Sequence, residues 1–205
     1  MRTLSKEEQR QITPYKAIQL LKDGNRRFVG NLRLNRNFLQ QISETRDGQS
    51  PFAVVISCMD SRTSAELIFD QGLGDIFSIR IAGNVINEDI LGSAEFGCKI
   101  VGAKVVVVLG HSNCGAIKGA VDDVDVGHLR SITRKIQRCI PSREATYDEM
   151  SAVEKISFVT RENIRLAIQD VRTRSSVLAA LESEEKIAIV GGFYNVSTGE
   201  IEFYE

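Results

Sequence analysis

Four short runs rich in β-branched residues constrain the fold of this chain more than any other feature. They lie at residues 52–57, 76–80, 104–109 and 186–191. Continuous apolar runs of this length suit strands that are buried on both faces of a parallel sheet. Between them, segments with helical spacing lie at residues 65–71, 89–101 and 114–126. This alternation predicts an α/β fold with a mostly parallel central sheet flanked by helices.

The two ends of the chain add a hairpin and a helical arm to this prediction. Residues 147–181 have helical spacing and would return the chain to the last strand. Residues 193–204, which contain a Ser-Thr-Gly break, predict a C-terminal hairpin. Residues 1–30 predict an N-terminal helical arm, with a helix at 14–28 after a polar stretch that either frays or grips a partner subunit. The length of 205 residues fits a single domain over residues 1–205.

Charge and apolar content argue against several classes of partner. The formal net charge is −1, so the surface offers no basic excess for a nucleic acid or an anionic membrane. The longest apolar runs are too short to span a bilayer, and the N-terminus lacks the apolar stretch of a secretory signal. These features favour a cytoplasmic protein, with import into an organelle left open. Four cysteines are too few for a disulfide scaffold and favour thiols that bind a metal or pack in the core.

Two polar motifs follow the first and third predicted strands. Cys58, Asp60 and Arg62 come after the first strand, and His111 and Cys114 come after the third. Open α/β sheets bind their ligands at the carboxyl ends of parallel strands, so these motifs occupy the expected position of a functional site. If the two strands are neighbours, Cys58 lies within reach of His111 and Cys114. Cys114 would also begin a helix, whose partial positive charge favours a thiolate.

Two thiolates and one imidazole form a set of zinc ligands that leaves the fourth position vacant. This arrangement is expected of catalytic rather than structural zinc, with a water molecule in the vacant position. Zinc lowers the pKa of such a water to about 7 where three histidines hold the metal. Two thiolates donate more charge than imidazoles, so the water here should be less acidic unless nearby groups compensate. The alternative is that Cys58 and Cys114 are core thiols and His111 is a loop histidine.

The pattern Cys58-x-Asp60-x-Arg62 followed by His111-x-x-Cys114 resembles the paired signature of the β-class carbonic anhydrases. The similarity extends from about residue 16 to residue 191 and includes Gly24-Asn25-Arg26-Arg27-Phe28, Arg80-Ile81-Ala82-Gly83-Asn84 and Ser93-Ala94-Glu95-Phe96. The resemblance implies reversible hydration of carbon dioxide to bicarbonate and a proton. It also implies one Zn²⁺ per subunit, held by Cys58, His111 and Cys114.

The resemblance further implies roles for three polar residues near the metal. Asp60 would accept the hydrogen of the zinc-bound hydroxide, while Arg62 keeps the Asp60 carboxylate ionised and turned away from zinc. Gln49 matches a glutamine that, in the plant-like branch of the family, hydrogen-bonds the substrate from the neighbouring subunit. Because two subunits then build each pocket, the resemblance implies a homodimer or a higher even oligomer.

The branch of the family can be assigned from one position. The branch that holds bicarbonate at an inhibitory site places a Trp three residues before the first metal-binding cysteine. That position is Val55 here, and the chain contains no Trp. The resemblance therefore implies the plant-like branch, open at neutral pH and without a regulatory bicarbonate pocket.

Three apolar positions match those that wall the substrate pocket of the family. They are Phe77, Ala82 and Phe96, although plain core packing would also explain each of them. Phe96 stands where Tyr is usual, and Ala82 is smaller than the usual Val or Ile, so the pocket would be roomier and more apolar. Two alternatives therefore stay open: hydrolysis of carbonyl sulfide or carbon disulfide on the same scaffold, and a catalytically silent relative that binds zinc or bicarbonate.

The remaining cysteines and the second histidine have a weaker pattern. Cys98 and Cys139 lack the spacing of metal ligands and are expected to be buried or idle thiols. His128 follows an acidic stretch at residues 122–126 whose spacing does not fit a calcium loop, so a solvated loop is expected there. His128 has a suitable pKa range for carrying protons, but the sequence does not place it near the zinc.

Overall fold

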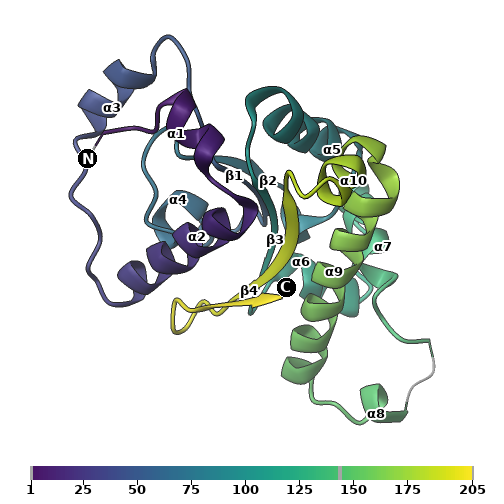
Figure 1. The fold of residues 1–205 in the computed structure, drawn as a ribbon. Helices are drawn as coiled ribbons and strands as arrows, with labels where there is room; N and C mark the ends of the chain where they lie inside the picture. The colour runs from purple at the N-terminus through teal and green to yellow at the C-terminus, as the bar shows by residue number, and fades with distance from the viewer. Residues whose placement is uncertain (1, 143–144, 205) are drawn as a thin grey trace.

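A five-stranded sheet forms the centre of the protein in the computed structural model, which describes residues 2–142 and 145–204. The strands are β1 (Ala53–Ser57), β2 (Ile76–Arg80), β3 (Val105–His111), β4 (Ala188–Tyr194) and β5 (Ile201–Tyr204), in the spatial order β2-β1-β3-β4-β5. The first four strands are parallel, and β5 returns antiparallel to β4 as a hairpin (Figure 1). The predicted α/β class, the parallel sheet and the C-terminal hairpin are confirmed.

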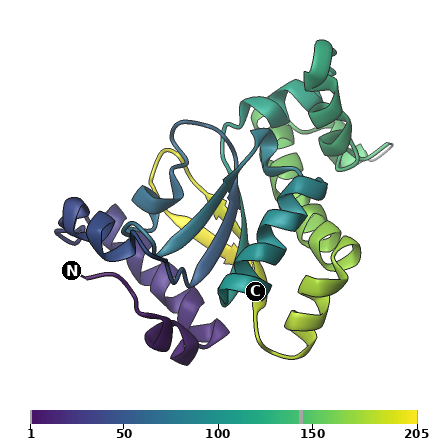
Figure 2. The same ribbon diagram turned by 90° about the horizontal axis from the view of Figure 1, so that it is seen from above.

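Alternate side chains of the central strands face two different helical layers. Val54 and Val106 pack in a core with helices α5, α9 and α10, whereas Val55 and Val107 pack in a core with α2 and α4. The layers are visible on opposite sides of the sheet (Figure 2). Every residue of β1 and β3 is buried, which is why both strands read as continuous apolar runs. These helices are α2 (Pro14–Val29), α4 (Ala65–Ile68), α5 (Glu88–Glu95), α9 (Ala152–Arg174) and α10 (Ser176–Ser183).

Helix ends differ from the prediction where local capping overrides the apolar period. The predicted helix at 89–101 is α5 followed by a π-helical turn, η2 (Phe96–Val101), which ends at Gly102 with φ of 100°. The predicted helix at 114–126 is α6 (Gly115–Val121), and Asp123 follows it with φ of 52°. The predicted continuous helix at 147–181 is divided into α8 (Ala145–Asp148), α9 and α10. Ser151 begins α9 with a capping box, and Ser175 caps α10.

The N-terminal arm is helical and packs on the body of the protein. A capping box formed by Ser5 and Glu8 begins α1 (Lys6–Gln11), and the buried Gln9 amide donates a hydrogen bond to the Pro51 carbonyl. In the described residues the polar stretch is therefore folded rather than frayed. Helix α2 lies so close to α4 that a Cβ at Gly24 would stand 1.7 Å from the Phe69 carbonyl oxygen.

Several short elements complete the described part of the chain. The sequence did not predict α3 (Phe38–Thr45), whose apolar residues Phe38, Leu39 and Ile42 are exposed. The other elements are η1 (Ala82–Asn84), η3 (Gly127–Leu129) and α7 (Arg130–Gln137). None of the helices in residues 2–142 and 145–204 has the length and apolar content needed to cross a membrane.

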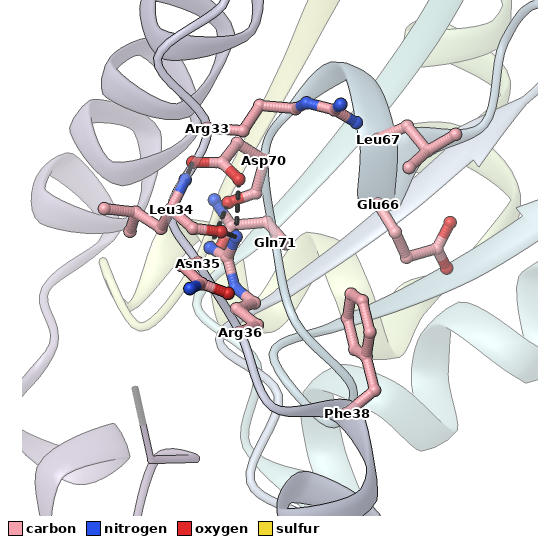
Figure 3. A pocket seen from close by; sticks show the side chains of 9 residues that line it. All are labelled: Arg33, Leu34, Asn35, Arg36, Phe38, Glu66, Leu67, Asp70 and Gln71. Atoms are coloured by element: carbon pink, nitrogen blue, oxygen red, sulfur yellow. Dashed lines mark hydrogen bonds and ion pairs between the residues drawn. The ribbon is translucent and has the colours of Figure 1, made fainter.

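A buried carboxylate fastens the segment between α2 and α3 to the end of α4. Asp70 accepts hydrogen bonds from the Arg36 guanidinium group and from the Leu34 amide (Figure 3). The Arg27 guanidinium group also donates to it. The side chains of Asp70 and Arg36 are only 2% and 5% exposed. Burial raises the pKa of Asp70, but Arg27, Arg36 and the Leu34 N–H outweigh it, so the pKa lies below its usual value. The carboxylate is therefore ionised and paired in the native state.

Replacing Asp70 by Asn should lower the free energy of unfolding by about 3–5 kcal/mol, because the buried Arg36 loses its charge partner. Asn tolerates the left-handed backbone at this position, where φ is 45°. The native pKa is depressed, so the contribution of Asp70 is complete above its unfolded pKa of about 3.9 and is lost as the pH falls through the native value. Urea unfolding from neutral to acid pH should show the two stabilities converging.

The exposed pair of Arg46 and Asp47 supplies a matched control for this experiment. These side chains are 73% and 85% exposed, so Asp47→Asn should leave the unfolding midpoint unchanged. Equal stability of Asp70→Asn and the wild type at neutral pH would contradict the role given to Asp70.

Candidate metal centre

The two polar motifs meet at the carboxyl ends of β1 and β3. These strands pair in parallel, with Ser57 opposite Leu109, so Cys58 leaves β1 beside the end of β3. The chain runs from β1 to β2 on one side and from β3 to β4 on the other, which makes this end of the two strands the switch point of the sheet. His111 is the last residue of β3, a strand that ends two residues later than predicted, because His111 pairs with Tyr194 of β4. Cys114 is the N-cap of α6, as the sequence predicted.

Cys58, His111 and Cys114 form a compact group of metal-binding side chains. Their ligand atoms lie within 4.8 Å of one another, and the two sulfur atoms are 3.9 Å apart. Two thiolates bound at about 2.3 Å to one tetrahedral zinc ion lie roughly 3.8 Å apart, so the observed spacing fits zinc. All three residues are nearly inaccessible, at 4%, 1% and 1% exposure. The predicted set of ligands is therefore brought together in the interior.

The imidazole of His111 is oriented as a metal ligand. Its Nδ1 atom lies 2.9 Å from the Ser112 carbonyl oxygen, so Nδ1 carries the proton and Nε2 offers a lone pair. Nε2 is buried, and no group in the described residues hydrogen-bonds to it. Buried nitrogen atoms without a partner are rare in native proteins, and a metal ion accounts for this one.

The two thiols are strongly coupled. The contact with the Cys114 thiol lowers the pKa of Cys58, and the backbone N–H groups of Asp60 and Gly83 lower it further against the effect of burial. The same contact, together with burial, raises the pKa of Cys114. Both shifts arise from the contact between the two sulfur atoms, and a cation bound between them would displace the thiol protons.

Asp60 and Arg62 form a two-pronged ion pair beside the thiols. Arg62 donates from Nε to one carboxylate oxygen at 2.9 Å and from Nη2 to the other at 2.8 Å. The Arg62 side-chain hydrogen bond is the largest of the effects that lower the pKa of Asp60, so this carboxyl is ionised. Arg62 also contacts the Asn113 carbonyl oxygen at 3.3 Å, which links the two motifs. The carboxylate is thereby held in one orientation.

The backbone of the first motif is held by neighbouring residues for which the sequence predicted no role. Arg80 donates hydrogen bonds to the carbonyl oxygens of Cys58 and Asp60, and the Thr63 hydroxyl donates to Cys58 as well. Gly83 N–H lies 3.4 Å from Cys58 Sγ, and the Asn163 amide donates to the Gly83 carbonyl oxygen. Arg80 and Gly83 lie in a segment that resembles the family, which could have pointed to them. The sequence offers one indication for Asn163: it is a polar residue at an apolar position in the period of α9.

The predicted substrate residues do not all lie at this site. Ala82 precedes Gly83 and is close to Cys58 along the backbone. Phe77 and Phe96 pack against each other, with ring centroids 6.3 Å apart, and line an open hollow of about 770 Å³ together with Arg80. Gln49 is exposed and lies near Gly74, before β1 begins. Because Cys58 follows the five residues of β1, about 17 Å of strand separates Gln49 from the metal centre of its own subunit.

The other cysteines and His128 lie outside the group of metal-binding side chains. Burial raises the pKa of both Cys98 and Cys139 to about 12, which keeps these thiols protonated. Both are buried, in agreement with the prediction for them. His128 is exposed in η3, in agreement with the solvated loop predicted there.

A buried Cys-His-Cys group at the switch point of a parallel sheet, beside an oriented carboxylate, defines an α/β metalloenzyme with one open coordination position. Residues 53–201 match a family model described as carbonic anhydrase. A carbonic anhydrase of Mycolicibacterium smegmatis is 33% identical over 192 residues, covering 92% of each chain. Carbonic anhydrase 2 of Mycobacterium tuberculosis is 33% identical over 189 residues, covering 91% of this chain and 90% of that protein.

Solved structures agree with these sequence matches. The β-carbonic anhydrase CafA of Aspergillus fumigatus superimposes with a TM-score of 0.74 at 25% identity, covering 80% of each chain. A tetrameric β-carbonic anhydrase of Sordaria macrospora has a TM-score of 0.71 at 24% identity, covering 92% of this chain and 89% of that one, which bears on the fold alone. The chain belongs to the β class of the carbonic anhydrase family. It is an enzyme that hydrates carbon dioxide, and its Cys-His-Cys group is compatible with the zinc of this class.

Removing any one of the three side chains should abolish tight zinc binding, because three protein ligands leave none to spare. We expect Cys58→Ser, His111→Ala and Cys114→Ser each to lower zinc affinity by more than about 100-fold, beyond the usual effect of changing an outer residue. Zinc content after competition with a chelator measures this. Cys98→Ala is the matched control, since it removes a buried thiol outside the group and should leave zinc bound. Full zinc occupancy in any of the three variants would refute the assignment of that ligand.

Proposed function

We propose that Cys58, His111 and Cys114 hold one catalytic Zn²⁺ per subunit and that carbon dioxide is converted to bicarbonate and a proton at this site. The observation that carries the proposal is the unpartnered, buried Nε2 of His111 beside two thiols at zinc-binding distance. Zinc bound there supplies the Lewis acidity that lets a water molecule give up its proton near neutral pH. Reaction of that water with carbon dioxide then requires the chain to orient it.

In this proposal Asp60 orients the attacking water by accepting one of its hydrogens. The carboxylate is ionised, so it can only accept, and this directs a lone pair of the water oxygen toward the substrate. Arg62 acts on Asp60 rather than on the substrate. By occupying both carboxylate oxygens, it keeps Asp60 from turning toward the metal.

Substrate binding is proposed to need a second subunit. Gln49 lies too far from the metal centre of its own chain to contact a substrate there, but it is exposed and free to approach another copy. The exposed apolar residues of α3 lie a few residues before Gln49 and suit burial between subunits. The tetrameric state of the Sordaria macrospora relative supports assembly of this kind. We propose at least a homodimer in which Gln49 serves the site of the partner.

The apolar wall of the substrate site is proposed to consist of Phe77, Ala82 and Phe96. Phe96 is 53% exposed and opens on the hollow beside Arg80, so a second subunit would complete an enclosure there. Val55 is fully buried between the sheet and the α2 layer, where the bicarbonate-regulated branch has Trp. A valine at this position favours the plant-like branch. We also propose that residues 1–205 form one domain.

The relatives described above are all named carbonic anhydrases, which favours carbon dioxide over carbonyl sulfide or carbon disulfide as the substrate. The ion pair of Asp60 and Arg62 likewise argues against a catalytically silent relative, because a protein that only bound zinc would not need an oriented carboxylate.

The proposal is tested by measuring zinc content and stopped-flow hydration of carbon dioxide on the same sample, first for the wild type and then for Arg62→Ala. The wild type should bind one zinc per subunit and turn over. Without Arg62, the Asp60 carboxylate should swing to the metal, with an oxygen at roughly 2.0–2.2 Å from zinc in a crystal structure. The variant should therefore keep its zinc and lose about 100-fold or more of its turnover. Arg130→Ala is the control, because the Arg130 side chain is also paired with an aspartate and is about as exposed as that of Arg62, at 50% against 48%. Normal turnover in Arg62→Ala would contradict the role of this pair.

Gln49→Ala should lower turnover and leave zinc bound, whereas Gln169→Ala, at another exposed glutamine, should change neither. Complementation tests the origin of the side chain. A mixed dimer of a Gln49→Ala subunit and a Cys58→Ser subunit holds one intact metal centre, which receives Gln49 only from the partner. We expect the mixture to be more active than either variant alone. Absence of any recovery, in dimers shown to be mixed, would place Gln49 outside the shared site.

A further inference from the structure

A buried chain of hydrogen bonds runs from α9 to the sulfur of Cys58. The Asn163 side chain, 3% exposed, donates from Nδ2 to the Gly83 carbonyl oxygen at 2.8 Å. Gly83 in turn directs its N–H at Cys58 Sγ, 3.4 Å away. Asn163 stands on the apolar side of α9, next to the buried Ile164. A polar side chain in this position costs folding free energy unless it is hydrogen-bonded. The Asn163 amide meets this requirement by donating to Gly83, the residue whose N–H contacts Cys58.

Gly83 needs an anchor to keep its N–H on the sulfur. Its backbone has φ of 66° and ψ of 17°, a left-handed conformation that glycine adopts about as readily as the right-handed one. Another side chain cannot replace it easily, because a Cβ there would stand 2.7 Å from Ile136 Cδ1. Glycine therefore fits the available space, but its own backbone preference does not favour the left-handed conformation over the right-handed one. The bond from Asn163 to the Gly83 carbonyl oxygen holds this peptide in the orientation that the left-handed state requires.

We propose that Asn163 is a positioning residue which, through Gly83, holds an N–H···S hydrogen bond on Cys58 and thereby limits the electron density that this thiolate donates to the metal. The inference rests on the proposed function, because it assumes that Cys58 is a ligand. Asn163 lies on α9, far from both motifs in the sequence.

The effect on the metal follows from the charge of the ligands. Two thiolates and a neutral imidazole neutralise a divalent cation and weaken its Lewis acidity. A hydrogen bond to a sulfur withdraws part of that charge, and burial makes such a bond stronger than it would be in water. Cys114 is the N-cap of α6, so the partial positive charge at the start of that helix acts on its sulfur in the same sense. Asn163, through Gly83, thus helps to withdraw charge from the Cys58 sulfur, as the start of α6 does for the Cys114 sulfur.

The test uses the full-length protein loaded with Co²⁺, whose thiolate-to-cobalt charge-transfer bands report electron donation by sulfur. In Asn163→Leu, which removes the amide at similar volume, these bands should move to longer wavelength because the thiolate becomes a stronger donor. The zinc form of the variant should retain stoichiometric metal and lose roughly ten-fold in kcat, the scale expected for a residue outside the ligand set. Asn163→Ala removes the same donor without added bulk and should shift the bands in the same direction, which covers the case that the Leu variant does not fold.

Asn25→Leu is the matched control. Asn25 is also a buried amide that donates at 2.8 Å to the carbonyl of a left-handed glycine, Gly199, but it lies on α2 beside the hairpin. It should lose stability with unchanged cobalt bands and unchanged kcat per bound metal. Bands that do not move in either Asn163 variant, or that move equally in Asn25→Leu, would overturn the inference. Wild-type protein without thiolate-to-cobalt bands would instead overturn the proposed ligand set, so the two failures are distinguishable.

Discussion

The parallel pairing of β1 with β3 is the constraint on which the site depends. Each strand is buried on both faces, so its register is fixed by two helical layers at once, and a shift by one residue would exchange the cores that these layers form. With that register, the residue after Ser57 emerges beside the end of β3, and Cys58 meets His111 and Cys114. The chain leaves β1 toward β2 and leaves β3 toward β4, in opposite directions, which places the polar residues at the switch point of the sheet.

The polar groups around the site balance charges that would be costly in the interior if left unpaired. The Cys58 and Cys114 sulfur atoms lie 3.9 Å apart, and the Gly83 N–H lies 3.4 Å from Cys58 Sγ. The Asp60 carboxylate is held by both prongs of Arg62. His111 is the exception, since its Nε2 has no partner in the described residues. A cation at this position would satisfy the nitrogen and both sulfur atoms together, which is why the arrangement fits a metal better than a network of neutral hydrogen bonds.

The surfaces of a single chain are consistent with a site shared between subunits. Phe96 and the apolar residues of α3 are exposed, and the hollow beside Arg80 is open to solvent. Gln49 lies at the opposite end of β1 from the metal-binding cysteine. A second copy that covered these apolar residues would remove them from water and could bring its Gln49 to the metal centre. Burial of apolar surface would then drive both assembly and completion of the site.

The sequence by itself determined the elements whose information is local. The apolar runs predicted the buried strands, and the position of each motif after a strand predicted that Cys58, His111 and Cys114 come together, as they do. The roles of Asp60 and Arg62 were implied by the family resemblance. Helix ends were less predictable: the division of residues 147–181 depends on caps at Ser151 and Ser175 that the apolar period does not register. Only the tertiary structure decided that Asn163 reaches Gly83 and that Gln49 lies at the far end of β1 from its own metal centre. Those relations join residues distant in sequence, and the physical reason is that they depend on packing between layers, which no local pattern encodes.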